Sequence, residues 1–296
     1  MNLTTYFKDF ENFLKLERNL SKNTIQSYRS DLKKFEVFLS KTNVEKLKYI
    51  NPEIVREFLY EQSKKVTGKT QGRIISTLRS FYNFLVLEKI AENNPIEDID
   101  YPKIDSKVPF VLSTNEIDKI ILQASLTKFG ARNQTMIEVM YSCGLRVSEV
   151  IEMKISNIFF DESLIKVVGK GKKERFVPLS GIAKKLLCNY IECERKESKF
   201  DKQSVDIVFL NNRGGKLSRI MLYNIINDAA LAAEINSKIS PHTLRHSFAT
   251  HLIENGADII SIQKMMGHEN IVTTEKYLNV NKKHLVETVI KYHPRK

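Results

Sequence analysis

The feature that most constrains this fold is a stretch without helical periodicity that divides the 296-residue chain into two parts. It begins at Asn93-Asn94-Pro95, contains Pro102 and Pro109, and runs to about Leu112. Proline removes a backbone donor and ends helices, and domain boundaries fall in such segments. We therefore expect two domains, at 1–100 and 113–296, joined by an extended linker at 101–112.

Before this stretch, apolar residues recur at spacings of three or four, the period of a helix buried along one side. The four segments with this pattern are 3–14, 25–39, 54–59 and 74–85. Asn51-Pro52 is typical of an N-cap followed by proline at the first helical position. The first domain is thus predicted to be a bundle of four helices, the last of them stopped by Asn93.

After the linker, the pattern predicts helices and one hairpin. Ser113 and Glu116 have the spacing of a capping box, and a helix at about 134–142 is expected to end at Gly144. The β-branched and apolar runs 164–168 and 175–179 flank a glycine- and lysine-rich tip, which is typical of a β-hairpin. The predicted fold class is mostly α with a small hairpin or sheet.

Two further helices carry polar residues at their ends. Ser240-Pro241 is expected to begin a helix that ends before Gly256, with His242 and Arg245 on the same side of its first turn. The free amides at such an end attract phosphate. Asp258 is expected to cap the next helix.

Gly267 is predicted to end that helix, so that His268 follows directly. Asn270 is expected to begin a short helix with Tyr277 on its surface.

Each polar residue considered singly also fits an ordinary structural role. Arg146 has Glu149 three residues on as an ion-pair partner, and a glycine-flanked lysine tip is usually a soluble turn. That tip is no Walker loop, because no GKS or GKT follows at the required spacing. His242 and His246 are spaced like a metal pair, but no carboxylate or cysteine accompanies them.

The local words and their order together resemble the tyrosine recombinases of the phage integrase family, most closely the Xer type. The words are CGLRVSE at 143–149, GKGKKER at 169–175, HTLRHSFATH at 242–251, GH at 267–268 and TTEKY at 273–277. The resemblance extends from LSKNT at 20–24 to HPR at 293–295. Met266 stands where a leucine is usual, and Leu278-Asn279 where Xer proteins commonly carry threonine and histidine, which leaves the subgroup open.

The resemblance implies an N-terminal SAM-like core-binding domain and a C-terminal catalytic domain. The activity it implies is that of a site-specific recombinase that cuts and rejoins DNA through a 3′-phosphotyrosyl intermediate. Its site residues carry over as Arg146, Lys170, His242, Arg245, His268 and Tyr277, the last being the nucleophile.

These residue types suit the chemistry. Guanidinium groups such as those of Arg146 and Arg245 stay charged and can hold two phosphate oxygens, with His268 adding a hydrogen bond. A phenol near pKa 10 needs surrounding positive charge and a base before it attacks. The family implies that His242 assists this proton removal and that Lys170 protonates the leaving 5′ oxygen. Because the covalent link keeps the bond energy, no metal, ATP or other cofactor is expected.

Composition agrees with a nucleic-acid partner. Lys and Arg number 47 against 35 Asp and Glu, a net charge of +12 that suits a polyanion, although a generally basic proteome would give the same excess. Candidate DNA contacts, expected to act as a patch rather than singly, are Lys22, Lys33, Arg73, Arg79, Lys172 and Lys173.

Three cysteines without a CxxC pair argue against a disulfide framework or a structural zinc site, and so favour the reducing cytoplasm. No apolar run approaches the length that spans a bilayer, so neither secretion nor membrane insertion is expected.

The Xer resemblance implies resolution of chromosome or plasmid dimers, and hence a role in chromosome partition, cell division and the cell cycle. A mobile-element integrase or transposase, acting in DNA integration, uses the same chemistry, and a type IB topoisomerase shares the nucleophile. The implied partners are double-stranded DNA with a specific site, a homo- or hetero-tetramer with a second recombinase, and a DNA translocase. The segment 280–292 is expected either to dock on a neighbouring protomer or to pack on its own domain.

Overall fold

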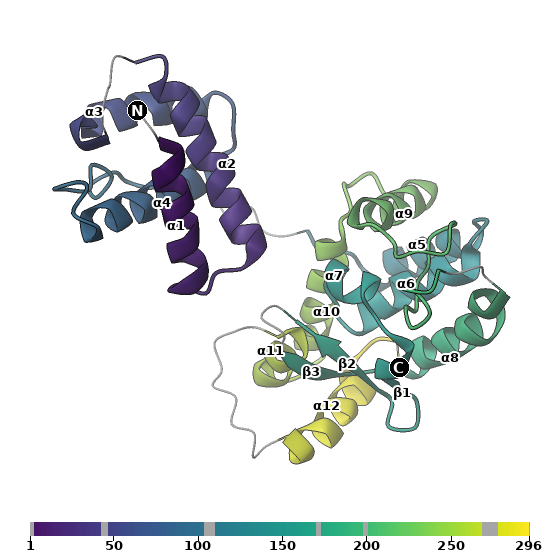
Figure 1. Cartoon of the computed structure of the whole chain (residues 1–296). Helices are drawn as coiled ribbons and strands as arrows, with labels where there is room; N and C mark the ends of the chain where they lie inside the picture. Colours follow the sequence, from purple (N-terminus) through teal and green to yellow (C-terminus); the bar gives the residue numbers. More distant parts are fainter. Residues whose placement is uncertain are drawn as a thin grey trace. The chain divides into compact units, whose positions relative to one another are not determined.

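The computed structural model describes residues 3–42, 47–103, 110–169, 173–197, 201–267 and 278–295. The chain forms two compact units, Met1–Lys107 and Val108–Lys296, which are drawn in Figure 1. The division falls inside the stretch that lacks helical periodicity. The finer boundaries at 100 and 113 remain a proposal.

The first unit is helical, as the period of three and four predicts. Its elements are α1 (Leu3–Leu16), α2 (Lys22–Leu39), the 3-10 turn η1 (Leu47–Tyr49), α3 (Pro52–Ser63) and α4 (Gly68–Leu87). Side chains cap three of these helices: Ser21 accepts from Thr24 N, Asn51 from Ile54 N and Thr67 from Thr70 N. Each cap satisfies an amide that the helix leaves unpaired at its N-terminus.

Aromatic rings fill the core between these helices. Phe10, Phe35, Phe58 and Phe81 are fully buried, and the Phe10 and Phe81 rings meet edge to face with centroids 5.3 Å apart. One helix end differs from the prediction, because α4 ends at Leu87 rather than at Asn93. There Lys89 adopts a left-handed φ of 57°. The chain then folds back, and the amide of Ile90 donates to Leu85 O at 2.8 Å.

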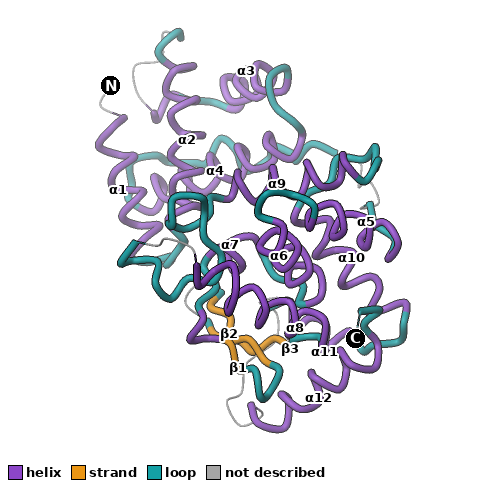
Figure 2. Tube along the Cα trace, turned by 90° about the vertical axis from the view of Figure 1, so that its right-hand side faces the viewer, coloured by secondary structure: helices purple, strands orange, loops and turns teal. Residues whose placement is uncertain are grey.

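The second unit is mostly helical, with a small sheet that lies beside α11 and α12 (Figure 2). Its helices are α5 (Thr114–Ser125), α6 (Gly130–Ser142), α7 (Val147–Ile151), α8 (Gly181–Tyr190), α9 (Arg219–Ala232), α10 (Pro241–Glu254), α11 (Ile259–Met266) and α12 (Leu278–Tyr292). The shorter turns are η2 (Ile155–Asn157) and the π-helical η4 (Ile191–Arg195). The helix predicted at 134–142 begins earlier, at Gly130, without a side-chain cap to mark its start.

The predicted hairpin is present as β2 (Leu164–Val168) and β3 (Glu174–Pro178), paired antiparallel with Ile165 opposite Val177. A short strand, β1 (Ile158–Phe159), joins the other edge of β2 and gives the order β1-β2-β3. Two residues are too few to show alternation, so the sequence did not reveal β1. The fold is mostly α with a small antiparallel sheet, as predicted.

α6 is the central helix of this unit. Its side chains are buried along nearly the whole length, and it packs against α5, α8 and α10. α6 ends at Ser142 inside the core, and the residues that follow it, Cys143 and Leu145, are fully buried. The turn that contains them carries Arg146.

The end of the chain packs on its own unit. Leu285 and Val289 belong to the second unit's core, and α12 lies against β3 and α11 (Figure 1). Beyond the helix, His293 is fully buried and Arg295 Nε donates to Glu138 Oε2 at 2.8 Å. The single chain thus adopts the second of the two alternatives, and donation to a neighbour remains a proposal.

Among the helices described, none combines the length and apolarity needed to cross a membrane.

Candidate active site

Three of the predicted site residues line one cavity of about 470 Å³ in the second unit. They are Arg146, His242 and Arg245. The remaining lining residues are Phe110, Ser240, Thr243, His246 and Met266. Residues almost 100 positions apart in the sequence therefore meet, as a phosphate-binding site built from both segments requires.

Arg146 stands between the end of α6 and the start of α7. Its Nη1 donates to Glu149 Oε1 at 2.9 Å, and its backbone amide donates to Glu149 Oε2 at 2.8 Å. Its Nη2 donates to Gly267 O at 2.9 Å. The ion pair with Glu149 that the spacing allows is therefore formed. It coexists with a place on the cavity wall, because each Nη carries two N–H groups.

Arg245 lies one turn into α10 and is nearly buried. Its Nη1 donates to Gly144 O and its Nη2 to Met266 O, both at 2.5 Å. Its Nη1 also lies 4.0 Å from Glu149 Oε2. The guanidinium is thus fixed on two sides by backbone oxygens, which presents it to the cavity in one orientation.

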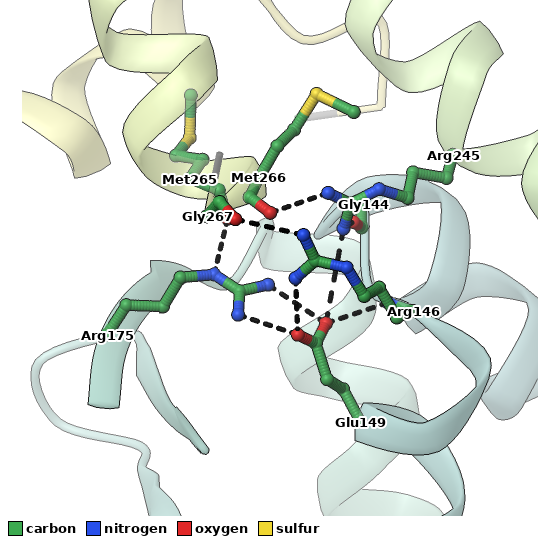
Figure 3. A network of polar contacts seen from close by, with 8 residues as sticks. All are labelled: Gly144, Arg146, Glu149, Arg175, Arg245, Met265, Met266 and Gly267. Carbon is green, nitrogen blue, oxygen red and sulfur yellow. Dashed lines mark hydrogen bonds and ion pairs between the residues drawn. The ribbon is translucent and has the colours of Figure 1, made fainter. Parts of the chain in front are cut away.

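A third arginine completes the network shown in Figure 3. Arg175, in β3, donates from Nη1 to Glu149 Oε1 at 2.7 Å and from Nη2 to Glu149 Oε2 at 2.9 Å. Its Nε donates to Met265 O at 2.7 Å. The three arginines therefore converge on one carboxylate and on three consecutive carbonyls, those of Met265, Met266 and Gly267, at the negative end of α11.

The charge balance of this network favours an anion. Three guanidinium groups surround the single carboxylate of Glu149, which leaves an excess of positive charge. Burial, and next the charge of Arg146, lower the pKa of Arg245 to about 10 despite Glu149. A bound phosphodiester would relieve that repulsion, since an opposite charge favours the charged form of the arginine.

His242 reaches the cavity from the first turn of α10. Ser240 caps this helix by accepting from Thr243 N at 3.3 Å, and Pro241 is its first residue, both as predicted. Thr243 and His246 line the same wall. The cavity thus faces a helix N-terminus, where amides and an imidazole can meet a phosphate together.

The other predicted site residues fall outside the described part of the chain. In the sequence, Lys170 and Lys172 lie between β2 and β3, and His268 and Tyr277 follow α11. Their roles stay predictions. The sequence neighbours of these residues are described: β2 and β3 flank Lys170 and Lys172 in the sequence, and Gly267, with a φ of 65°, ends α11 directly before His268.

The candidate DNA contacts divide into exposed lysines and engaged arginines. Lys22 and Lys33 are exposed on α2, and Lys173 is exposed beside β3. By contrast, Arg73 pairs with the buried Asp31. Arg79 donates to the carbonyls of Ile96 and Ile99 and lies over the Tyr101 ring. These contacts give both arginines a structural task in the first unit, and DNA binding by the six residues remains a prediction.

Two functional candidates went unnoticed in the sequence. Glu149 entered only as a partner for Arg146, and Arg175 only as part of a strand. Their signal was present in the quoted words, which contain both residues, but nothing in the words pairs a residue at 149 with one at 175.

A metal site was the alternative for His242 and His246. Across the described ranges, no three His, Cys, Asp or Glu side chains gather as a metal site would require.

Gly144 holds the turn that carries Arg146, and we expect Gly144→Ala to lower the free energy of unfolding of the second unit by about 3 kcal/mol. Gly144 has a left-handed φ of 58°, and an added Cβ would lie 2.4 Å from the Phe248 ring. Chemical unfolding of the purified chain measures the loss. The matched control is Gly215→Ala, whose Cβ would be 3.4 Å from Asn211. Equal midpoints for the two variants would contradict this account of Gly144.

Comparison with known proteins places the chain among DNA recombinases. The model of the phage integrase family matches residues 111–284, and that of the phage integrase N-terminal SAM-like domain matches residues 7–89. The chain is 38% identical to tyrosine recombinase XerD of Staphylococcus epidermidis over 295 residues, covering 99% of this chain and 100% of that protein.

Solved structures give the same result. The crystal structure of XerA recombinase is 31% identical, covers 99% of both chains and has a TM-score of 0.51. XerH site-specific recombinase, in a post-cleavage complex with a palindromic difH substrate, is 25% identical with a TM-score of 0.73. That likeness covers 95% of this chain and 83% of XerH.

Proposed function

This chain belongs to the phage integrase family and is a site-specific tyrosine recombinase, and we propose that it is an Xer-type enzyme that resolves chromosome or plasmid dimers. The observation that carries the site assignment is the cavity where Arg146, His242 and Arg245 meet. An arginine pair with excess positive charge fits the non-bridging oxygens of one phosphodiester. Tyr277 and His268 lie close in sequence to the end of α11, which these arginines bind.

The proposed reaction balances without a cofactor. The Tyr277 hydroxyl attacks phosphorus while His242 takes its proton, and an Oη–P bond forms. The bond from phosphorus to the 5′ oxygen breaks, and Lys170 supplies the proton that this oxygen needs. Arg146, Arg245 and His268 stabilise the negative charge on the non-bridging phosphate oxygens in the transition state. The 5′ hydroxyl of a second duplex then attacks the phosphotyrosine, reversing each step and restoring the backbone.

The proposed reaction determines which partners the chain needs. The substrate is double-stranded DNA, and two strand exchanges between two duplexes use four protomers, so we propose a tetramer on DNA. We further propose that a second recombinase shares this tetramer and that a DNA translocase activates it. We propose that the protein acts in the cytoplasm. α12 is the segment we propose for exchange between protomers.

A two-stage experiment tests this function. The chain is incubated with a pool of randomised, nicked duplexes in the presence of a chelator and without nucleotide, and DNA that stays linked to protein in denaturant is sequenced. Two copies of the recovered site are then placed on one supercoiled plasmid. We expect the segment between them to be excised or inverted, with cleaved 3′ ends on the protein.

The alternatives give other outcomes. Relaxation of the plasmid without exchange would indicate a type IB topoisomerase. Exchange that needs two dissimilar sites would indicate a mobile-element integrase. Binding with no covalent product would mean that the chain is a DNA-binding module, and the proposal would fail.

A further inference from the structure

Arg175 connects three segments that carry the proposed chemistry. It lies in β3, five residues after Lys170 in the sequence. Its two Nη atoms bind both oxygens of Glu149 in α7, and its Nε binds Met265 O in α11. One side chain therefore joins β3, the helix α7 that begins after Arg146, and the helix α11 that ends before His268.

Arg175 does not take part in the cavity itself. Among the described residues, Arg146 and Arg245 line the cavity and Arg175 does not. The Arg175 side chain is 13% exposed, against 36% for Arg146. All of its guanidinium nitrogens are directed at protein oxygens. This geometry suits a residue that acts through others and does not touch DNA.

The contact with Glu149 determines where Arg146 lies. Glu149 accepts from both the backbone amide and the Nη1 of Arg146, so a shift of the carboxylate moves the main chain and the guanidinium together. The Glu149 side chain is 2% exposed. With Arg175 bound to both oxygens, the carboxylate is restrained from both sides, because a bidentate pair fixes direction as well as distance.

The contact with α11 determines where the chain leaves that helix. Besides the hydrogen bond to Met265 O, the Arg175 side chain packs so closely on Gly267 that a Cβ there would lie 3.2 Å from Arg175 Cδ. Gly267 is the last residue before His268. The aliphatic part of Arg175 thus supports the turn while its Nε binds the helix end.

We propose that Arg175 is a positioning residue for DNA cleavage. Through Glu149 it fixes the position of Arg146, and through Met265 it fixes the end of α11, from which the chain continues to His268 and Tyr277. This inference rests on the proposed function, because it concerns the same reaction. It gives a role in the reaction to a strand residue that does not line the cavity.

The charges around Glu149 support this role. Burial alone would raise the pKa of Glu149, but hydrogen bonds and charge from Arg175, and then from Arg146, outweigh burial and lower it. The charged groups that face Glu149 are Arg146 beside it, Arg175 from β3 and Arg245 from α10. Without Arg175 the pKa of Glu149 rises, so the carboxylate is neutralised at a higher pH and releases Arg146 there.

The test compares Arg175→Met with the parent chain on a nicked duplex. Protein is saturating, so that the single-turnover rate constant of covalent linkage is separated from the dissociation constant for DNA. We expect the rate constant, per folded molecule, to fall about 10- to 100-fold, because small displacements of reacting groups have effects of this size. The dissociation constant should change less than about 3-fold, since the guanidinium nitrogens of Arg175 already bind protein oxygens and DNA affinity comes from phosphate contacts.

The pH profile supplies a readout that a structural role would not move. We expect the ratio of the parent rate constant to that of Arg175→Met to grow as the pH is lowered, because Glu149 is neutralised at a higher pH in the variant. The proposed base is common to both proteins and cancels in the ratio. Glu149→Gln removes the titrating group, so in that background the ratio should no longer depend on pH. Arg175→Lys keeps the charge but not the three directions of contact, and should be intermediate in rate.

Arg195→Met is the matched control. Arg195 is also a buried arginine of this unit, and it donates to the carbonyls of Ile207 and Ser204. Its replacement should lower stability while leaving the rate constant per folded molecule and the pH profile unchanged. Parent-like rate and pH profile in Arg175→Met, or losses that only follow its folded fraction, would overturn the inference. If the parent chain itself forms no covalent product, the proposed function fails instead.

Discussion

Tyr277→Phe is expected to abolish covalent linkage to DNA altogether while leaving DNA binding intact. The substitution removes one hydroxyl, the oxygen that is to bond to phosphorus, and a benzene ring offers no replacement. Affinity should persist because it comes from basic side chains that neutralise phosphates. A gel in denaturant, run after incubation with the nicked duplex, measures linkage, and a shift under native conditions measures binding.

A tyrosine elsewhere in the second unit provides the control for this experiment. Tyr223→Phe, in α9, removes the same hydroxyl from a half-buried position and should retain full linkage. The sequence contains 11 tyrosines, and Tyr277 is singled out by its distance from His268 and by the family pattern. Linkage that survives in Tyr277→Phe would mean that another hydroxyl is the nucleophile.

Arg245→Gln is expected to lower the rate constant of covalent linkage to DNA by about 100- to 1,000-fold. This is the usual effect of losing one group that stabilises the charge of the transition state. Glutamine keeps a donor but loses the charge and the second contact direction. The substitution also removes the arginine donor from Gly144 O and Met266 O, which costs about 1–3 kcal/mol for the buried Gly144 O. Rates are therefore compared per folded molecule, with unfolding followed in parallel.

Arg132→Gln separates stability from chemistry in that comparison. Arg132 is equally buried in α6 and donates to Leu210 O at 2.8 Å, but it is absent from the described lining of the cavity. It should destabilise the chain without slowing linkage in the folded fraction. Parallel losses of rate in the two variants would remove Arg245 from its proposed role.

Much of the fold follows from local sequence, because helix ends have local causes. The capping box of Ser113 with Glu116, the Ser240-Pro241 start and the Gly267 stop were all predicted and are all observed. The end of α4 was missed because it depends on Lys89 adopting a left-handed φ, a conformation that is uncommon for lysine and that its presence in a sequence does not predict. α8 and α9 were not predicted, although each begins at a serine N-cap, Ser180 and Ser218 respectively.

The candidate site was less predictable than the fold. The family words identify Arg146, His242 and Arg245, and the structure brings these three to one cavity. The contacts of Arg175 could not be foreseen, because they join strand, helix and helix end across 26 and 90 residues. Local spacing carries no record of such long-range pairs, so the support around the site emerges only from the folded chain.

The three carbonyls at the end of α11 have a consequence for how this site tolerates change. Met265 and Met266 bind arginines through backbone oxygens that every amino acid possesses, so an exchange of residue type there leaves those acceptors in place. Gly267 is different, because its φ of 65° and the nearby Arg175 side chain disfavour any other residue. An insertion or deletion of one residue would instead rotate each oxygen by about 100° around the axis of a 3.6-residue helix. The residue types at 265 and 266 can therefore change, whereas Gly267 and the length of α11 cannot.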